Sequence, residues 1–178
     1  TVIKMTSLSF INGTFSNLNQ GQPVTLSFAG NKYNLIANYY GGTGNELILH
    51  WANVRLMGWG QNFYGQVGGN SPGNSSAPEA VNMIGGLSGK TVFSEAAGIY
   101  HSLVLCSDGT LVAWGENSYG ELGLGNFTNT SFPTQVPSTG ALVGKTVIAV
   151  AAGQSHSLAL CSDGTIAAWG YNNYGQLG

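Results

Sequence analysis

The chain has 178 residues, a net charge of −2 and only five lysine and arginine residues. Nucleic-acid grooves and anionic membrane patches need clustered basic side chains, so this composition argues against a nucleic-acid partner. No stretch approaches the roughly 18 apolar residues of a membrane helix, and we expect no membrane insertion. Charged residues make up 7% and glycines number 28, which disfavours long helices and favours short strands and turns. The sequence therefore predicts an all-β protein.

Residues 1–53 form the first predicted segment. Apolar and polar residues alternate over 23–28, and turn-forming residues bound the stretches 33–40 and 46–51. This pattern predicts three strands joined by turns that contain glycine and asparagine. The stretch NYYGGTGNELILHW, which begins at Asn38, is similar to the closing segment of bacterial autotransporter-type β-strand repeats. That resemblance implies a small β-stem or β-hairpin segment of a secreted bacterial protein.

From residue 54 onward the chain repeats itself with a period of 55 residues. The motifs GWGQNFYGQVG, AWGENSYGELG and AWGYNNYGQLG stand at this spacing, and the segments that precede the last two also match. The recurring chemical positions are Trp59, Trp114 and Trp169, His101 and His156, Cys106 and Cys161, and Asp108 and Asp163. An internal repeat of this length indicates stacked supersecondary units, because one unit alone cannot bury both of its faces.

Within one repeat the pattern predicts three strands, over 147–152, 157–161 and 166–170. The Asp-Gly pair in Ser162–Thr165 favours a tight hairpin turn between the second and third strands. A fourth strand is expected over 132–137 in the complete copy, at an outer edge where proline is tolerated.

The patterns AAG-x-x-HSL-x-L-x-SDG and AWG-x-N-x-YG-x-LG resemble the regulator of chromosome condensation repeat, over roughly residues 55–178. That family folds as a β-propeller, so the resemblance implies antiparallel propeller blades over 54–178. About two repeats and a stub are present. Because the last copy stops inside a motif, we expect a fragment of a longer propeller, and the alternative is a ring completed by several chains.

The repeated polar residues have structural explanations. His101 and His156 are held apart as repeat equivalents, so we expect each ring to bond a loop backbone rather than a metal. Asp108 and Asp163 lie in SDGT turns, where aspartate suits the turn geometry. Cys106 and Cys161 are expected to be buried free thiols. The three recurring tryptophans are expected to fill one niche between blades, although a carbohydrate surface is the alternative. No cofactor, metal or catalytic site is predicted.

The loops over 69–78 and 125–132 are the predicted contact surfaces. Their candidate residues are Asn70, Asn74, Asn126 and Asn129, the last three of which begin N-x-S/T sequons, so a glycan is an alternative ligand. The first functional hypothesis is a non-enzymatic structural or adhesive module of a bacterial surface or secreted protein, acting outside the cell through assembly. The second is a propeller that binds a protein, as an inhibitor or receptor head. A nucleotide-exchange factor for a small GTPase ranks third, and an enzyme last.

Overall fold

The computed structural model describes residues 22–28, 31–41, 46–51, 55–70 and 73–178. The chain divides into two compact units, Thr1–Trp51 and Ala52–Gly178. In the first unit, β1 (Pro23–Phe28), β2 (Asn31–Gly41) and β3 (Glu46–Trp51) form one antiparallel sheet in that order. The strands predicted for this segment are confirmed, while the turns expected between them fall largely outside the described residues.

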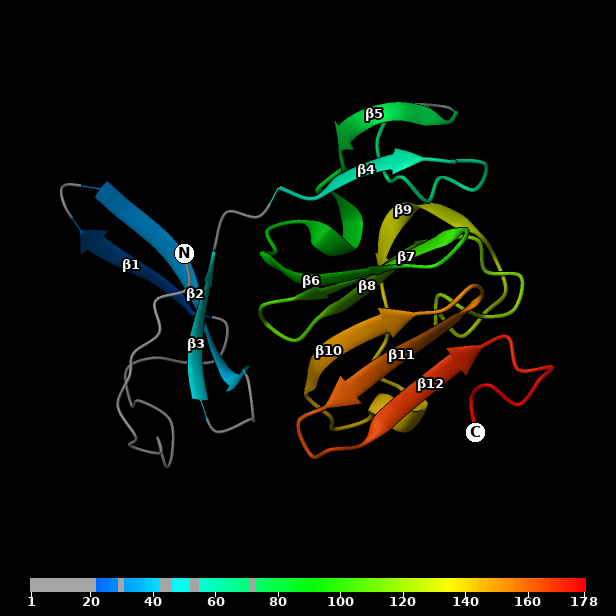
Figure 1. Ribbon diagram of the computed structural model, residues 1–178. Helices are drawn as coiled ribbons and strands as arrows, with labels where there is room; N and C mark the ends of the chain where they lie inside the picture. Colours follow the sequence, from blue (N-terminus) through cyan, green and yellow to red (C-terminus); the bar gives the residue numbers. More distant parts are fainter. Residues whose placement is uncertain (1–21, 29–30, 42–45, 52–54, 71–72) are drawn as a thin grey trace. The chain divides into compact units, whose positions relative to one another are not determined.

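The second unit consists of three successive antiparallel sheets (Figure 1). The first holds β4 (Met57–Gly60) and β5 (Ser75–Ala80). The second holds β6 (Val92–Ala97), β7 (His101–Cys106), β8 (Leu111–Gly115) and β9 (Thr130–Gln135). The third holds β10 (Val147–Ala152), β11 (His156–Cys161) and β12 (Ile166–Gly170). Two short 3-10 helices, η1 (Gly85–Leu87) and η2 (Gly140–Leu142), lead into β6 and β10.

The predicted all-β fold of antiparallel blades is confirmed. The middle sheet is a complete four-stranded blade in the order β6-β7-β8-β9. Its outer strand β9 begins and ends two residues earlier than the 132–137 expected from the sequence. Pro133 lies inside β9, which pairs only with β8 among the described strands, so its missing N–H costs no ladder hydrogen bond. The described residues include no helix long and apolar enough to cross a membrane.

Strand β7 shows how the sheets stack. Successive side chains of a strand point to opposite faces, and every side chain at positions 103–106 is buried. Leu103 and Leu105 join the core cluster toward β10 and β11, whereas Val104 and Cys106 join the cluster that holds Val81 and Trp114. The middle sheet therefore packs on a neighbour at both faces, which is the stacking that the repeat requires.

The strand-to-loop junctions depend on glycine at one recurring position. Gly115 has a φ of 113°, and a Cβ there would lie 2.3 Å from the carbonyl oxygen of Tyr100. Its repeat equivalent Gly170 has a φ of 105° and meets the oxygen of Ser155 in the same way. Only glycine combines this backbone conformation with so close an approach. The turn after β6 and the loop after β8 are thus held side by side.

Candidate interaction face

A shared carbonyl acceptor joins neighbouring blades. The carbonyl oxygen of Gln66 accepts hydrogen bonds from Trp114 Nε1 at 2.9 Å and from Ser102 Oγ at 2.8 Å. One repeat later, the carbonyl oxygen of Glu121 accepts from Trp169 Nε1 at 2.9 Å and from Ser157 Oγ at 2.8 Å. Each blade thus bonds, through its tryptophan and serine, to the loop of the blade before it.

The three recurring tryptophans do not share one environment. Trp114 is 2% exposed and Trp169 makes the equivalent hydrogen bond, but Trp59 is 62% exposed. The expectation of one common niche is therefore wrong for Trp59. Strand β4 pairs only with β5 among the described strands, and Trp59 lines a groove of about 320 Å³ beside it. The indoles of Trp114 and Trp169 pack between blades and bond a carbonyl oxygen of the preceding loop, and Trp59 has no such bond in the described residues.

His101 is also part of the contact between blades. Its ring is 1% exposed, and Nε2 lies 3.0 Å from Ser157 Oγ of the next blade. Ser157 already donates its single hydroxyl proton to Glu121, so Nε2 donates to the serine and Nδ1 carries no proton. The ring therefore bonds a serine side chain rather than the loop backbone expected from the sequence. Burial lowers the pKa of His101 to about 4, and the neighbouring His156 adds to the shift.

The loop after each third strand is held by two side chains that recur at one spacing. Asn117 Oδ1 accepts a hydrogen bond from Leu122 N, and Glu121 Oε2 accepts one from Tyr119 N. The side chains of Asn62 and Gln66 make the same bonds in the first copy, and those of Asn172 and Gln176 make them in the last. Side chains of the loop itself thus hold its backbone, and they do so in all three copies although other residues of the loop differ.

Glu121 is a carboxyl at a position where the other two copies carry an amide. It is 1% exposed, and its Oε1 has no hydrogen-bond partner in the described part of the chain. Burial raises the pKa of Glu121. Glutamine stands at both equivalent positions, Gln66 and Gln176. The sequence showed this difference between the copies, but the burial that gives it meaning is visible only in the fold.

We expect Glu121→Gln to stabilise the chain by about 1 kcal/mol at pH 7, because it removes a buried negative charge, although the amide nitrogen of the equivalent Gln66 is also buried without a partner in the described residues. A raised pKa means that the unfolded state ionises first as the pH rises, so the gain should shrink toward pH 4. Urea unfolding at both pH values measures it. The matched reverse change, Gln66→Glu, should destabilise. If both changes lower the stability at pH 7, this assignment is wrong.

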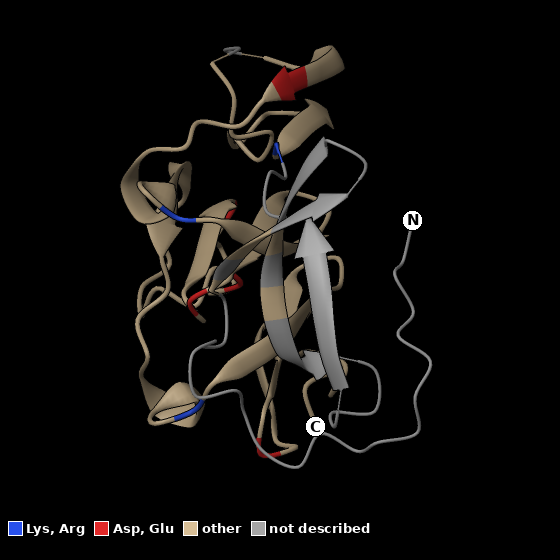
Figure 2. Cartoon of the chain, turned by 90° about the vertical axis from the view of Figure 1, so that its left-hand side faces the viewer, with Lys and Arg blue, Asp and Glu red and all other residues tan. Residues whose placement is uncertain are grey.

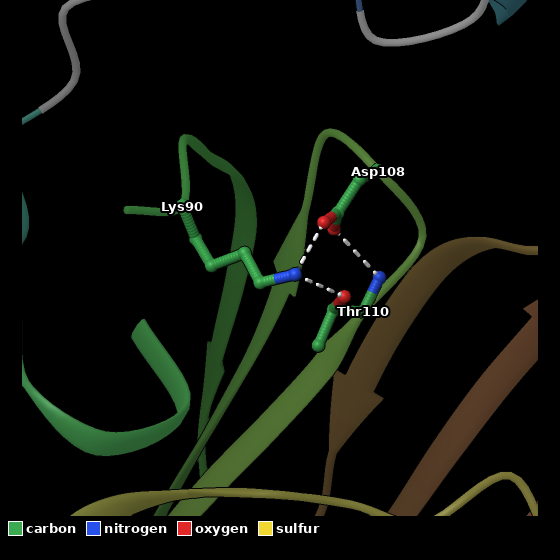
Figure 3. Close-up of polar contacts among 3 residues, drawn as sticks. All are labelled: Lys90, Asp108 and Thr110. Carbon is green, nitrogen blue, oxygen red and sulfur yellow. Dashed lines mark hydrogen bonds and ion pairs between the residues drawn. The ribbon is translucent and has the colours of Figure 1, made fainter. Parts of the chain in front are cut away.

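The opposite ends of the strands carry the paired charges. Lys90 Nζ bonds Asp108 Oδ2 and, at 3.1 Å, Thr110 Oγ1, while Asp108 Oδ1 accepts from Thr110 N at 3.0 Å (Figure 3). Lys145 and Asp163 form the same pair one repeat later. The hydrogen bond from Lys145 lowers the pKa of Asp163 well below its usual range. The aspartates thus hold the hairpin turns, as predicted, and also bind a lysine that the sequence analysis missed.

We expect Asp108→Asn to cost less than about 1 kcal/mol, because the pair is solvent-exposed and asparagine can still accept the turn hydrogen bond. The loss should shrink further in 1 M salt, which screens the pair. Asp108→Ala removes the turn bond as well and should cost more. Chemical denaturation at low and high salt distinguishes the two variants, and equal losses at both salt concentrations would contradict an ion-pair contribution.

Both cysteines are free and buried, as the sequence predicted. Burial raises the pKa of the Cys106 thiol to about 11, so at neutral pH it is not a nucleophilic thiolate. Among the described residues, no group of three or more His, Cys, Asp or Glu side chains converges as metal ligands would.

The loops at the far end of the strands from the lysine–aspartate pairs form what we call the loop face, on the right in Figure 1. It comprises the described residues of the loops after β4, β8 and β12, over 61–70, 73–74, 116–129 and 171–178, and the turns at 98–100 and 153–155. These segments contain no lysine or arginine, and their acidic residues are Glu116 and the buried Glu121. Figure 2 shows how sparse charged residues are along the chain.

Two exposed phenylalanines lie on the loop face at positions where the repeats differ. Phe63 is 72% exposed, and serine and asparagine stand at its equivalent positions 118 and 173. Phe127 is 73% exposed, and proline stands at its equivalent position 72. Exposed apolar side chains that no repeat shares are not needed to hold the blade. They are therefore candidates for contact with another molecule.

The four asparagines predicted as contact residues lie in these loops but mainly shape them. Asn74 Oδ1 accepts from Asn62 N, and Asn129 Oδ1 accepts from Asn117 N. Asn126 accepts from Asn117 Nδ2 and Thr128 N, and Asn70 accepts from Asn82 Nδ2. Their amides support the loops, while the exposed aromatic residues between them offer the free surface. In the sequence, Phe63 and Phe127 could have been found as aromatic residues at positions where the other copies carry other residue types.

Comparison with known proteins agrees with this architecture. Models of the regulator of chromosome condensation (RCC1) repeat match residues 108–160 and 147–176. The chain is 36% identical over 133 residues to human protein RCC2 and 35% identical over 132 residues to the human probable E3 ubiquitin-protein ligase HERC6. Each alignment covers 74% of this chain, but only 24% and 12% of those relatives. The chain therefore spans a small part of the relatives it matches.

Among solved structures, yeast RCC1 (Prp20) bound to Kap60 matches with a TM-score of 0.53 and 23% identity, over 79% of this chain and 30% of that one. This likeness concerns the fold. Neither family model reaches residues 1–53, whose resemblance to autotransporter β-strand repeats stays a prediction. The period of 55 residues, the stacked antiparallel blades and these matches agree, and the repeats of the second unit are therefore RCC1 repeats folded as β-propeller blades.

Proposed function

We propose that the loop face binds a partner protein and that the chain acts as part of a protein-binding propeller rather than as an enzyme. The observation that carries this is the display of exposed, non-repeating aromatic side chains on a loop frame whose hydrogen bonds recur in every copy. Loops of tyrosine, serine, glycine and asparagine on a rigid scaffold are also the composition of antibody paratopes, which bind proteins.

Two further observations support the proposal. Yeast RCC1 (Prp20) was crystallised with Kap60 bound to it, so a protein that contains this fold binds another protein in that case. The buried position and raised pKa of Cys106 argue against a nucleophilic role for this thiol. A location outside the cell, as part of a secreted or surface protein, remains our proposal from the low charge and the stem-like first segment.

Affinity capture with the full-length protein tests this function. Phe63→Ser places on the face the residue that position 118 already has, and Phe127→Ser removes the second exposed ring. Phe132→Ala is the matched control, because Phe132 is 59% exposed on the outer strand β9 and alanine stands at its equivalent position 77. We expect proteins retained by the wild type and the control to be lost by both loop variants.

Mass spectrometry identifies the retained proteins, and a purified partner then gives the dissociation constant of each variant. Capture that is indifferent to the loop variants would contradict the proposal. A glycan array supplies the second readout. Binding of glycans by the wild type, in place of any protein, would assign the loop face to carbohydrate instead.

A further inference from the structure

Two tyrosine rings meet on the loop face at the junction of the first and second blades. Tyr64 belongs to the loop after β4, and Tyr100 belongs to the turn between β6 and β7. Their ring centroids are 5.3 Å apart, with the planes at 62°. Both side chains are partly exposed. An edge-to-face pair of this kind leaves ring surface, with its negative potential, open to solvent.

The backbone of Glu116 is bonded to this pair. Glu116 N donates a hydrogen bond to the carbonyl oxygen of Tyr100 at 2.8 Å. One repeat later, Tyr171 N donates in the same way to Ser155, and the Tyr171 ring contacts the Tyr119 ring at 4.7 Å. Residues 64 and 119 are repeat equivalents, as are 116 and 171. The backbone of Glu116 therefore holds, relative to Tyr64, the position that the backbone of Tyr171 holds relative to Tyr119.

The charge of Glu116 has no basic counterpart on this face. Its Oε1 accepts a hydrogen bond from Ser118 Oγ at 3.1 Å. The loop-face segments contain no lysine or arginine, and Lys90 and Lys145 pair with aspartates at the opposite strand ends. The face therefore combines two π-surfaces with an unneutralised carboxylate, which together favour a cation.

We propose that the cluster of Tyr64, Tyr100 and Glu116 receives a cationic side chain, arginine or lysine, of the protein that binds the loop face. This inference rests on the proposed function, whose partner it describes. The second junction provides an internal contrast: serine replaces Tyr100 at position 155, and Tyr171 replaces the carboxylate. The contacting rings of Tyr119, Tyr171 and Tyr174 there form an aromatic surface without the acid.

Titration by NMR with N-acetyl-arginine amide tests the cluster directly, and the neutral N-acetyl-citrulline amide is its control. We expect saturable shifts at the Tyr64 and Tyr100 rings with arginine and about tenfold weaker binding of citrulline. The preference should decline with added salt, as charge attraction requires.

The repeats themselves supply the variants. Glu116→Gln introduces the residue found at position 61, and Tyr100→Ser introduces the residue found at position 155. Each should abolish the preference for arginine over citrulline without changing the unfolding midpoint by more than a surface substitution does. Tyr171→Gln, at the second junction, is the matched control and should leave that preference intact.

Equal binding of the two amides by the wild type overturns the inference, as does an arginine preference that survives Glu116→Gln. The isolated partner gives the decisive comparison. If the partner binds Glu116→Gln as tightly as the wild type but is lost with Phe127→Ser, the proposed function stands and this inference falls. If binding ignores every loop-face change, the proposed function itself falls.

Discussion

Trp114→Ala is expected to cost about 3–5 kcal/mol of unfolding free energy, a large share of the roughly 5–15 kcal/mol that holds a domain together. The indole is 2% exposed and packs in the cluster that contains Val81 and Val104. Its Nε1 donates to the carbonyl oxygen of Gln66, so truncation leaves both a cavity and a weakened bond between blades. Gly68 closes the niche, because a Cβ there would lie 2.8 Å from Nε1.

Trp59→Ala is the matched control, since it truncates the same repeat position where the indole is 62% exposed. It should cost less than about 1 kcal/mol, as exposed substitutions usually do. Urea unfolding of the two variants, followed by tryptophan fluorescence and circular dichroism, makes the comparison. Equal losses would refute the wedge assignment. A Trp114→Ala protein that melts like the wild type but loses a carbohydrate ligand would make the indole a binding platform.

Periodicity predicts the blades because each copy confirms the others. The spacing of 55 residues placed three strands of the repeat to within one residue, and the Asp-Gly turn was assigned from its local chemistry. Gly164 has the expected positive φ, 84°, and Cys161 N bonds Thr165 O across that turn. The outer strand β9 was less accurate, because Pro133 and its neighbours carry little alternation and edge strands are weakly specified.

The proposed interaction face could not be predicted in the same way, because its exposed residues stand at positions where the copies differ. Phe63 and Phe127 give no signal of periodicity, and their exposure depends on a loop backbone fixed by Asn62 and Asn117. Glu121 illustrates the same limit. A comparison of the copies shows a carboxyl among amides, but only the fold shows that it is buried and that its carbonyl oxygen bonds the next blade.

The contact between blades should also make the protein sensitive to acid. Well above pH 6.5, His101 is neutral in both the folded and unfolded states and adds no pH dependence. Below that value His101 becomes protonated in the unfolded state, whereas in the folded state it stays neutral until about pH 4. The free energy of unfolding should therefore fall by about 3 kcal/mol between pH 7 and pH 4 through this one residue.

The structural reason lies in the two ring nitrogens. Nε2 donates to Ser157 Oγ, so an added proton must go to Nδ1, which is buried and has no hydrogen-bond partner in the described residues. Gly98 packs against this edge of the ring, since a Cβ there would lie 2.3 Å from Nδ1. His101→Gln disturbs the contact with Ser157, so the variant should be less stable than the wild type at pH 7. Because glutamine does not titrate, the variant should lose about 3 kcal/mol less than the wild type on acidification. Urea unfolding at pH 7, 5.5 and 4.5 measures both slopes. Parallel slopes would mean that acid acts through the carboxylates alone and that the imidazole accepts its proton without breaking the contact between blades.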